Sequence, residues 1–304
     1  MERKSLIAIA IIGILAGAFI TWTAVGVFFG EEITKDDENE DIKLYISGST
    51  TCFPIIVKCA EEFEEDNDGI DIAVSGGGSS KGISDVINDI SDLGMASRPL
   101  KSSESSISGM TQKAFAADGI ALAMKAGNTH FSGGYVPQWT MEDVLKVFNG
   151  TYQYWDEVPG CEDHDQIVLI GRDSNSGTRA SFEEITGLED DAGYLDILSG
   201  SSWQTIVELT SNGAVHDAVV ADEDAIGYIG LGYIDSAVDT IDLWNVDNYY
   251  QATADNVKSG DYPISRNLYL IYRYEIPEDA EDFVDFIFSI KGQAIVEDEG
   301  FVKL

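Results

Sequence analysis

The chain has 304 residues, of which 44% are hydrophobic, and it carries a formal net charge of −36 at pH 7. This length is enough for two domains of ordinary size with real hydrophobic cores. So negative a charge argues against nucleic acid as a partner, because nucleic-acid binding needs a basic face, and it is more typical of a protein kept soluble in a salt-rich medium.

The first predicted element is a membrane anchor at the N-terminus. Residues 5–29 carry no charge, and a helix of this length spans a lipid bilayer. Basic residues precede the segment and acidic residues follow it, so the positive-inside rule leaves the N-terminus in the cytoplasm and the rest of the chain outside. A cleaved signal peptide is the alternative. We favour an uncleaved transmembrane helix within residues 1–30, followed by an acidic linker over residues 31–41.

Three later stretches share one design, in which a short apolar strand leads through a loop rich in glycine and hydroxyl side chains to the start of a helix. They are residues 43–63 with the loop at 48–51, residues 70–89 with the loop at 75–80, and residues 167–185 with the loop at 171–179. One glycine-rich loop is weak support for a binding site. Three loops of the same design in one chain are harder to explain as plain turns.

The third of these loops is the strongest candidate for an anion site. The first N–H groups of a helix have no partner within the helix, and the helix dipole adds partial positive charge there. Ser176 and Thr178 offer hydroxyl donors, Gly177 allows close approach of the backbone, and Arg172 presents a guanidinium fork. Such a site works through local dipoles, which is compatible with an acidic protein. An ordinary capped helix is the alternative for this loop taken alone.

The rest of the chain continues to alternate between strands and helices. Further predicted elements are a strand edge at 92–100, an apolar strand at 119–125, a helix at 141–148, strands at 227–233 and 269–272, and helices at 280–290 and 292–299. This alternation predicts an α/β fold with mainly parallel sheets. In such sheets ligands bind beyond the carboxyl ends of the strands, where the three loops lie.

The cysteines and histidines form no recognisable motif. Cys52, Cys59 and Cys161 are odd in number, and we interpret them as small buried residues without a disulfide framework. The acidic stretch 161–165 contains His164 and could bind a metal, but its spacing is irregular and favours a solvated loop. We therefore expect no metal, no cofactor and no catalytic residue.

Eight short stretches, taken in order, resemble one known family. They lie at residues 48–51, 77–83, 118–123, 148–150 with Trp155, 172–182, 225–233, 262–266 and 291–296. Together they are similar to the phosphate-binding protein of the phosphate ABC importer, over about residues 42–304. The resemblance implies a hinged, two-domain, type-2 solute-binding fold that buries phosphate in the cleft between its lobes.

The resemblance also implies lobe boundaries and a ligand set. The first α/β lobe would comprise residues 42–120 and 246–304, and the second lobe residues 121–245, with hinge crossings near 119–125 and 240–246. The implied phosphate-binding residues are Thr50, Thr51, Cys52, Ser79, Ser97, Arg172, Ser176, Gly177 and Thr178. Which of the first three supplies a hydroxyl stays open.

Ser97 departs from part of that family. Some members have an aspartate at this position, which accepts the proton of hydrogen phosphate and helps to reject sulfate. Ser97 carries no charge, so the selectivity of the site stays open. Asp173 either compensates for the missing carboxylate or orients the guanidinium of Arg172.

The predicted function is extracytoplasmic binding of inorganic phosphate and its delivery to the membrane permease subunits of an ABC importer, from a single-pass anchor in the cell membrane. A binding protein for sulfate or tungstate is an alternative on the same fold. A phosphatase is less favoured, because no serine nucleophile has a histidine motif near it in the sequence. Asn149 begins a glycosylation triplet, a pattern that is common by chance.

Overall fold

The computed structural model describes residues 42–131, 137–200, 202 and 204–304. The predicted anchor and the acidic linker lie outside these residues. Of the helices that are described, none is long and apolar enough to cross a membrane. The described residues belong to one compact unit, Glu40–Leu304.

The first elements alternate between strand and helix, as the sequence predicts. They are β1 (Ile42–Gly48), α1 (Phe53–Asp66), β2 (Ile70–Gly76), α2 (Ser79–Ile87), β3 (Leu93–Ala96) and α3 (Ser102–Ser105). Helix α1 forms because apolar residues recur on one face, so that Ile55, Ile56, Cys59, Ala60 and Phe63 are all buried. The strand β4 (Met110–Lys125) follows and is longer than the stretch predicted for it.

The middle of the chain carries most of the remaining short elements. They are β5 (Gln138–Trp139), α4 (Met141–Phe148), the 3₁₀ helix η2 (Trp155–Glu157), β6 (Val168–Arg172), α5 (Gly177–Thr186), η3 (Leu188–Asp190), α6 (Ala192–Ser199), β7 (Ile206–Leu209), α7 (Asn212–Ala221), β8 (Ala225–Gly230), η4 (Leu231–Tyr233), β9 (Val238–Thr240), β10 (Asp242–Asn245) and β11 (Asn248–Tyr250). The chain closes with α8 (Ala254–Ser259), β12 (Ser265–Arg273), α9 (Glu278–Phe288), α10 (Ile290–Asp298) and β13 (Val302–Lys303).

The main sheet is mixed. Its strand order is β2-β1-β3-β12-β4-β8-β6-β7, and β9 and β13 also pair with β4. Strand β1 is parallel to β2 and β3, and β6 is parallel to β7 and β8. In contrast, β4 is antiparallel to β12, β13, β8 and β9. The expectation of mainly parallel sheets is therefore wrong at the centre, because an apolar run identifies a buried strand but not its direction.

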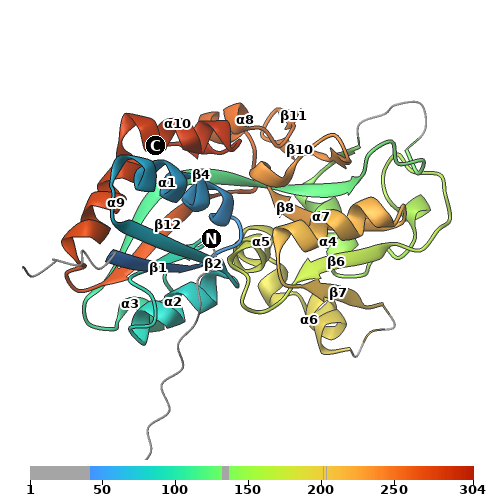
Figure 1. Ribbon diagram of the computed structural model, residues 1–304. Coiled ribbons are helices and arrows are strands. Elements are labelled where there is room, and N and C mark those ends of the chain that lie inside the picture. Colours follow the sequence, from blue (N-terminus) through green and yellow to red (C-terminus); the bar gives the residue numbers. More distant parts are fainter. Residues whose placement is uncertain (1–41, 132–136, 201, 203) are drawn as a thin grey trace, which may run out of the picture. The chain divides into compact units, whose positions relative to one another are not determined.

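Strand β4 connects two groups of elements. Its first part pairs with β12 up to Gly119, and its last part pairs with β8 and β9 from Ile120 to Lys125. In Figure 1 it runs from the group around β1, β12 and α1 to the group around β8 and α7. A strand that pairs in both groups is the direct covalent and hydrogen-bonded link between them.

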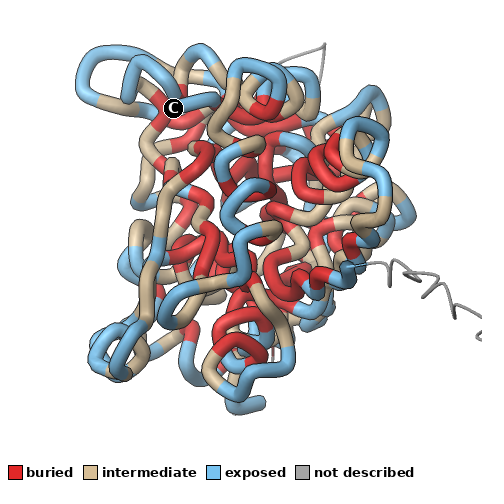
Figure 2. Tube along the Cα trace, turned by 60° about the vertical axis from the view of Figure 1, so that its left-hand side comes forward, coloured by how far each residue is buried: buried red, intermediate tan, exposed pale blue. Residues whose placement is uncertain are grey.

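Most of the core among the described residues lies in two large hydrophobic clusters, beside two smaller ones. One contains residues of α1, β1, α9 and α10, and the other is built mostly from residues between Ile120 and Ile264. The boundary between the two clusters crosses β4, where Ala116 belongs to the first cluster and Ile120 to the second. It crosses the chain again where β12 begins, between Ile264 of the second cluster and Leu268 of the first. Figure 2 shows the buried residues gathered inside, with exposed residues along the outer turns.

Several local expectations need correction. The predicted strand 227–233 ends at Gly230 and continues as the 3₁₀ turn η4, because the N–H of Leu231 donates to Asp118 Oδ1 at 2.9 Å and leaves the ladder. The predicted helix 81–89 begins earlier, at Ser79, directly after Gly78 turns the chain with φ 91°. Helix α7 and strand β7 were not predicted.

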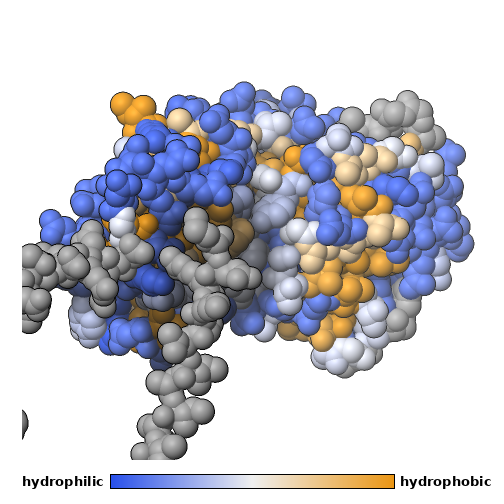
Figure 3. Space-filling view, in the orientation of Figure 1, coloured by the Kyte–Doolittle hydropathy of each residue, from blue (hydrophilic) through white to orange (hydrophobic). Residues whose placement is uncertain are grey.

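The surface is mostly polar on the face shown in Figure 3, as the net charge leads one to expect. Hydrophobic atoms are visible mainly in the region of α6, α7 and β7, with hydrophilic residues on either side.

Candidate anion-binding site

Loops that lie far apart in the sequence meet where α1, α2 and α5 begin. Thr51 Oγ1 lies 3.0 Å from Thr178 Oγ1, although the two residues are 127 positions apart. The N–H of Ser80 donates to the carbonyl of Asn175 at 3.1 Å. In Figure 1, α5 begins beside the strands β1 and β2. The three loops that share one sequence design therefore form one polar cluster.

Arg172 is the central cation of this cluster. It ends β6 and is 2% exposed. Its guanidinium donates from Nη2 to Thr50 Oγ1 at 3.2 Å and to the carbonyl of Thr210 at 3.1 Å, and from Nε to the carbonyl of Leu209 at 3.2 Å. Its Nη1 is buried and has no hydrogen-bond partner within the part of the chain that the structure describes. Among the described residues, its hydrogen bonds thus go to hydroxyl and carbonyl oxygens and not to a carboxylate.

Burial changes the chemistry of that guanidinium. Removal from water lowers the pKa of Arg172 to about 10, and the nearby positive charge of Arg266 lowers it as well. The side chain is still charged at neutral pH. A buried cation without a carboxylate partner is costly unless an anion compensates for it. The negative charge of Asp173 favours the charged form of Arg172 and so opposes the lowering of its pKa. Asp173 Oδ1 accepts from the N–H of Asn175 at 3.0 Å, a hydrogen bond that orders the loop.

Arg266 brings a second guanidinium to the same cluster, paired with a carboxylate. Its Nη2 donates to Thr51 Oγ1 at 3.1 Å and to Asp118 Oδ2 at 2.8 Å, and its Nε donates to the same carboxylate oxygen at 3.1 Å. Nη1 of Arg266 is buried, and no described residue forms a hydrogen bond with it. Burial raises the pKa of Asp118, and the guanidinium opposes that rise. With Arg172 included, two cations face one acid, so the cluster has an excess of positive charge.

Neutral donors complete the surroundings of the two threonines. Asn212 opens α7 and donates from Nδ2 to Thr51 Oγ1 at 2.9 Å and to Thr50 Oγ1 at 3.3 Å. The hydroxyl of Tyr233 donates to the carbonyl of Thr50 at 2.6 Å. Thr51 therefore lies among Thr178, Asn212 and Arg266, where a hydroxyl can be held in a fixed orientation.

Ser79 and Ser97 lie against Gly177, the first residue of α5. Ser79 Oγ accepts from the N–H of Ser97 at 3.0 Å and lies 3.3 Å from its hydroxyl. A Cβ atom on Gly177 would lie 2.7 Å from Ser97 Oγ and closer still to Ser79 Oγ. Glycine is therefore required at position 177, because any side chain would separate α5 from these serines. Ser181 Oγ donates to the carbonyl of Ser97 at 3.1 Å, a further link between the two groups of elements.

Two of the predicted phosphate-binding residues, Ser176 and Cys52, direct their side chains to other partners. Ser176 is the N-cap of α5, and its hydroxyl accepts from the N–H of Arg179 at 3.1 Å. Cys52 is fully buried, with its sulfur 3.6 Å from the carbonyl of Ala96, and burial raises the pKa of the thiol to about 12. The side chain of Cys52 thus faces the core, so only its backbone is a candidate for ligand contact.

The sequence analysis missed three members of this cluster. Arg266 and Asp118 fall within stretches quoted for the family resemblance, but nothing in their local sequence links them. They meet because they lie opposite each other in the antiparallel register of β12 and β4. Asn212 begins a helix that was not predicted, and the Ser211 cap before it was the available signal.

The cluster as a whole can hold a tetrahedral oxyanion. It offers guanidinium N–H groups, hydroxyls from two loops and the start of a helix, all buried, where hydrogen bonds to charge are strong. The unpartnered Nη1 atoms of the two arginines are donors available to such an anion.

Comparisons with known proteins show which family the chain resembles. A family model described as the PBP superfamily domain matches residues 34–291. The phosphate-binding protein PstS of Borreliella burgdorferi is 29% identical over 282 residues, covering 89% of this chain and 92% of the relative. A crystal structure from Clostridium perfringens, described as a phosphate ABC transporter substrate-binding protein with bound phosphate, is 32% identical, covers 86% of this chain and 99% of that chain, and has a TM-score of 0.74.

A third comparison extends the similarity. An ABC-type phosphate transport receptor from Vibrio cholerae is 25% identical, covers 86% of this chain and 100% of that chain, and has a TM-score of 0.65. The mixed sheet with helices described above is thus the two-domain α/β fold of periplasmic binding proteins. The chain belongs to the PBP superfamily and is similar along most of its length to the phosphate-binding proteins named PstS.

Proposed function

We propose that this chain binds inorganic phosphate in the cluster around Arg172 and delivers it to the permease subunits of an ABC importer. The observation that carries the proposal is the buried guanidinium of Arg172, which is surrounded by hydroxyls and lacks a carboxylate partner among the described residues. A phosphate anion supplies the missing negative charge. The similarity to phosphate-binding proteins over most of the chain supports the same ligand.

The proposed ligand set has three kinds of donor. Arg172 supplies charge, while side-chain hydroxyls and backbone N–H groups supply neutral hydrogen bonds. The neutral set comprises Thr50, Thr51, Cys52 through its backbone, Ser79, Ser97, Ser176, Gly177 and Thr178. Arg266 and Asn212 orient Thr51 and add donors beside it.

The proposed mechanism is closure of two lobes on the anion. The lobes are residues 42–120 with 246–304, and residues 121–245, as the family resemblance implies. Thr51 and Ser97 belong to the first lobe, and their partners Thr178 and Ser181 belong to the second. These contacts can exist only in a closed arrangement, and opening must break them. Small-angle scattering should show a smaller radius of gyration when phosphate is bound, and an unchanged radius despite binding would contradict closure.

The proposed location is the extracytoplasmic face of the cell membrane, with the segment 5–29 as a single-pass anchor. The uncharged length of that segment and the charges on either side of it support the proposal. Mass spectrometry of the mature membrane-bound protein tests it. An intact N-terminal segment is expected, whereas a mature N-terminus near Glu31 would show cleavage.

We propose binding without catalysis. The described hydrogen bonds of the His130, His164 and His216 imidazoles go to aspartates, away from Arg172 and the threonines. The hydroxyls in the cluster bond to one another, to amides and to guanidinium groups, so no base is positioned to activate them. The protein should therefore not hydrolyse a phosphate monoester.

Calorimetric titration of the full-length protein in detergent with phosphate, arsenate and sulfate tests the proposal directly. We expect saturable binding of one phosphate, similar binding of arsenate and weaker binding of sulfate. Tighter binding of sulfate or tungstate would support the other oxyanion class. An absence of oxyanion binding would refute the proposal.

A further inference from the structure

A second charged cluster lies at the opposite ends of the strands that carry the anion site. Asp165 lies shortly before β6 and Asp224 immediately before β8, whereas Arg172 and Gly230 end these two strands. A strand rises about 3.3 Å per residue, so β8 separates Asp224 from the anion site by about 20 Å. The third member, His130, follows the end of β4. These three residues are independent of the proposed phosphate ligands.

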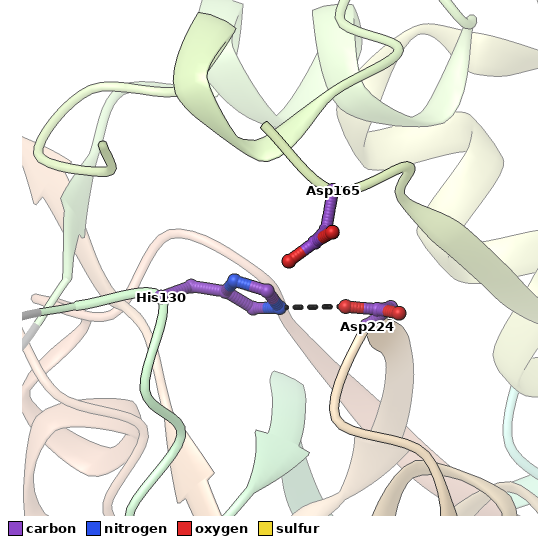
Figure 4. A group of neighbouring side chains, drawn as sticks. All are labelled: His130, Asp165 and Asp224. Carbon is purple, nitrogen blue, oxygen red and sulfur yellow. Dashed lines mark hydrogen bonds and ion pairs between the residues drawn. The ribbon is translucent and has the colours of Figure 1, made fainter. Parts of the chain in front are cut away.

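The three side chains converge. One ligand atom from each of His130, Asp165 and Asp224 lies within 4.8 Å of the others. Figure 4 shows the ring of His130 directed at Asp224, with Asp165 pointing toward the same space. The distance from His130 Nε2 to Asp224 Oδ1 is 2.9 Å. Metal–ligand distances of about 2.0–2.2 Å require ligand atoms roughly 4 Å apart or closer, and these atoms already lie within 4.8 Å of one another, with Asp165 exposed.

Trp155 holds all three ligands in place. Its backbone N–H donates to the carbonyl of Asp165 at 2.9 Å, and its indole Nε1 donates to the carbonyl of Asp224 at 3.2 Å. Its ring stacks on the imidazole of His130 with centroids 4.9 Å apart. A single buried residue that contacts all three members, through its backbone N–H and its indole ring, makes the arrangement preorganised and not a chance meeting of surface acids.

The loop that carries His130 is fixed to the same strand end. Asn128 Oδ1 accepts from the N–H of His130 at 2.9 Å, and Asn128 Nδ2 donates to the carbonyl of Glu223 at 2.7 Å. The hydroxyl of Thr129 donates to Glu223 Oε1 at 2.6 Å. The position of the imidazole relative to Asp224 is therefore set by backbone and side-chain hydrogen bonds on both sides.

The imidazole has the surroundings of a metal-binding histidine. Its side chain is 2% exposed, and its Nδ1 lies 3.3 Å from Asp163 Oδ2. When a metal is bound at Nε2, the Asp163 carboxylate would accept a hydrogen bond from Nδ1–H, which is the usual second shell of a metal-bound histidine. The three aspartates place up to three negative charges around one imidazole, an excess that a divalent cation reduces.

We propose that His130 Nε2, Asp165 and Asp224 bind a divalent transition-metal ion of the Zn²⁺ class, with water completing the coordination. One imidazole and two carboxylates suit Zn²⁺ or Mn²⁺, whereas Ca²⁺ prefers six or more oxygen ligands. Such an ion joins the segments before β6, before β8 and after β4. Its role is structural, because it connects three loops of the second lobe at the end remote from phosphate.

The test uses the full-length protein in detergent, stripped with EDTA and titrated with Zn²⁺ at pH 7 by calorimetry. We expect one saturable site and a higher melting temperature with the metal bound. Asp165→Asn, a change at an exposed side chain that should not affect folding, should weaken Zn²⁺ binding by at least about 100-fold. Asp163→Asn should weaken it by about 10- to 100-fold, as expected for loss of a second-shell carboxylate.

His216→Ala provides the matched control, because His216 also lies between two aspartates, Asp217 at 3.1 Å and Asp235 at 3.1 Å, but is not part of a three-ligand group among the residues that the structure describes. It should leave the Zn²⁺ affinity unchanged. Co²⁺ in place of Zn²⁺ should give visible absorption bands that Asp165→Asn alters and His216→Ala does not. The proposal is overturned if the protein binds no stoichiometric Zn²⁺, or if Asp165→Asn binds as tightly as wild type. Equal losses in Asp165→Asn and His216→Ala would also overturn it, because they would indicate unspecific binding to surface acids.

Discussion

The substitution Arg172→Ala is expected to separate phosphate affinity from the stability of the ligand-free protein. It removes the guanidinium whose described hydrogen bonds reach only hydroxyl and carbonyl oxygens. Truncating one partner of a buried charged contact costs roughly 2–5 kcal/mol. Phosphate should therefore bind about 30- to 4,000-fold more weakly, since each 1.4 kcal/mol corresponds to a factor of ten.

The effect on stability should differ in size. Burial lowers the pKa of Arg172 to about 10, and keeping the folded side chain charged at neutral pH then costs about 3 kcal/mol. Because the pKa is lower in the folded state, this cost is present in full at pH 7 and declines only as the pH rises from about 10 toward 12.5, the ordinary pKa of arginine. Removing the charge relieves the cost and offsets the lost hydrogen bonds. The ligand-free variant should therefore unfold near the wild-type urea midpoint.

Calorimetry with phosphate and urea unfolding followed by circular dichroism measure both quantities. Arg273→Ala is the control, because this arginine donates to the carbonyls of Ser108 and Ile87, away from the cluster. It should bind phosphate as wild type does. Unchanged phosphate affinity in Arg172→Ala would refute the proposed site. Equal losses of affinity in both variants would show that the effect is not specific to the cluster.

Three further substitutions test the surroundings of Arg172. Thr178→Val removes the hydroxyl that meets Thr51 and should weaken phosphate binding by about 1–3 kcal/mol in calorimetry, whereas wild-type affinity would exclude that hydroxyl from the site. Ser97→Asp should lower sulfate affinity more than phosphate affinity, because a carboxylate repels an anion without a proton to share; an unchanged ratio in paired titrations would contradict this. Arg266→Met leaves Asp118 buried and unpaired, and should lower the free energy of unfolding by about 3–5 kcal/mol in urea, with part of the loss recovered by adding Asp118→Leu. No recovery in the double variant would count against pairing as the cause.

The local features of the anion site could be predicted from the sequence. A strand, a loop with glycine and hydroxyl residues, and a helix start are all encoded within about twenty neighbouring residues, and three such units were predicted. The start of α5 and the position of Arg172 at the end of β6 follow from this local pattern. The sequence did not indicate that the side chain of Cys52 turns toward Ala96, because a helix start does not by itself fix which face is buried.

The charge balance of the site depends on long-range contacts. Arg266 and Asp118 lie 148 positions apart and pair because β12 is antiparallel to β4 in one register. The strand direction, which the apolar pattern does not specify, was predicted wrongly for the central strands. Asn212 reaches Thr51 across 161 positions through a helix that the sequence analysis did not identify.

The sequence by itself thus determined the helix-starting loops, the extreme acidity and Arg172, because each depends on neighbouring residues or on composition. Only the tertiary structure decided which of these loops meet, which cation has a carboxylate partner, and that His130, Asp165 and Asp224 converge at the far end of the same strands. The physical reason is that hydrogen bonds and ion pairs act over about 3 Å in space, whereas the sequence pattern records only distance along the chain.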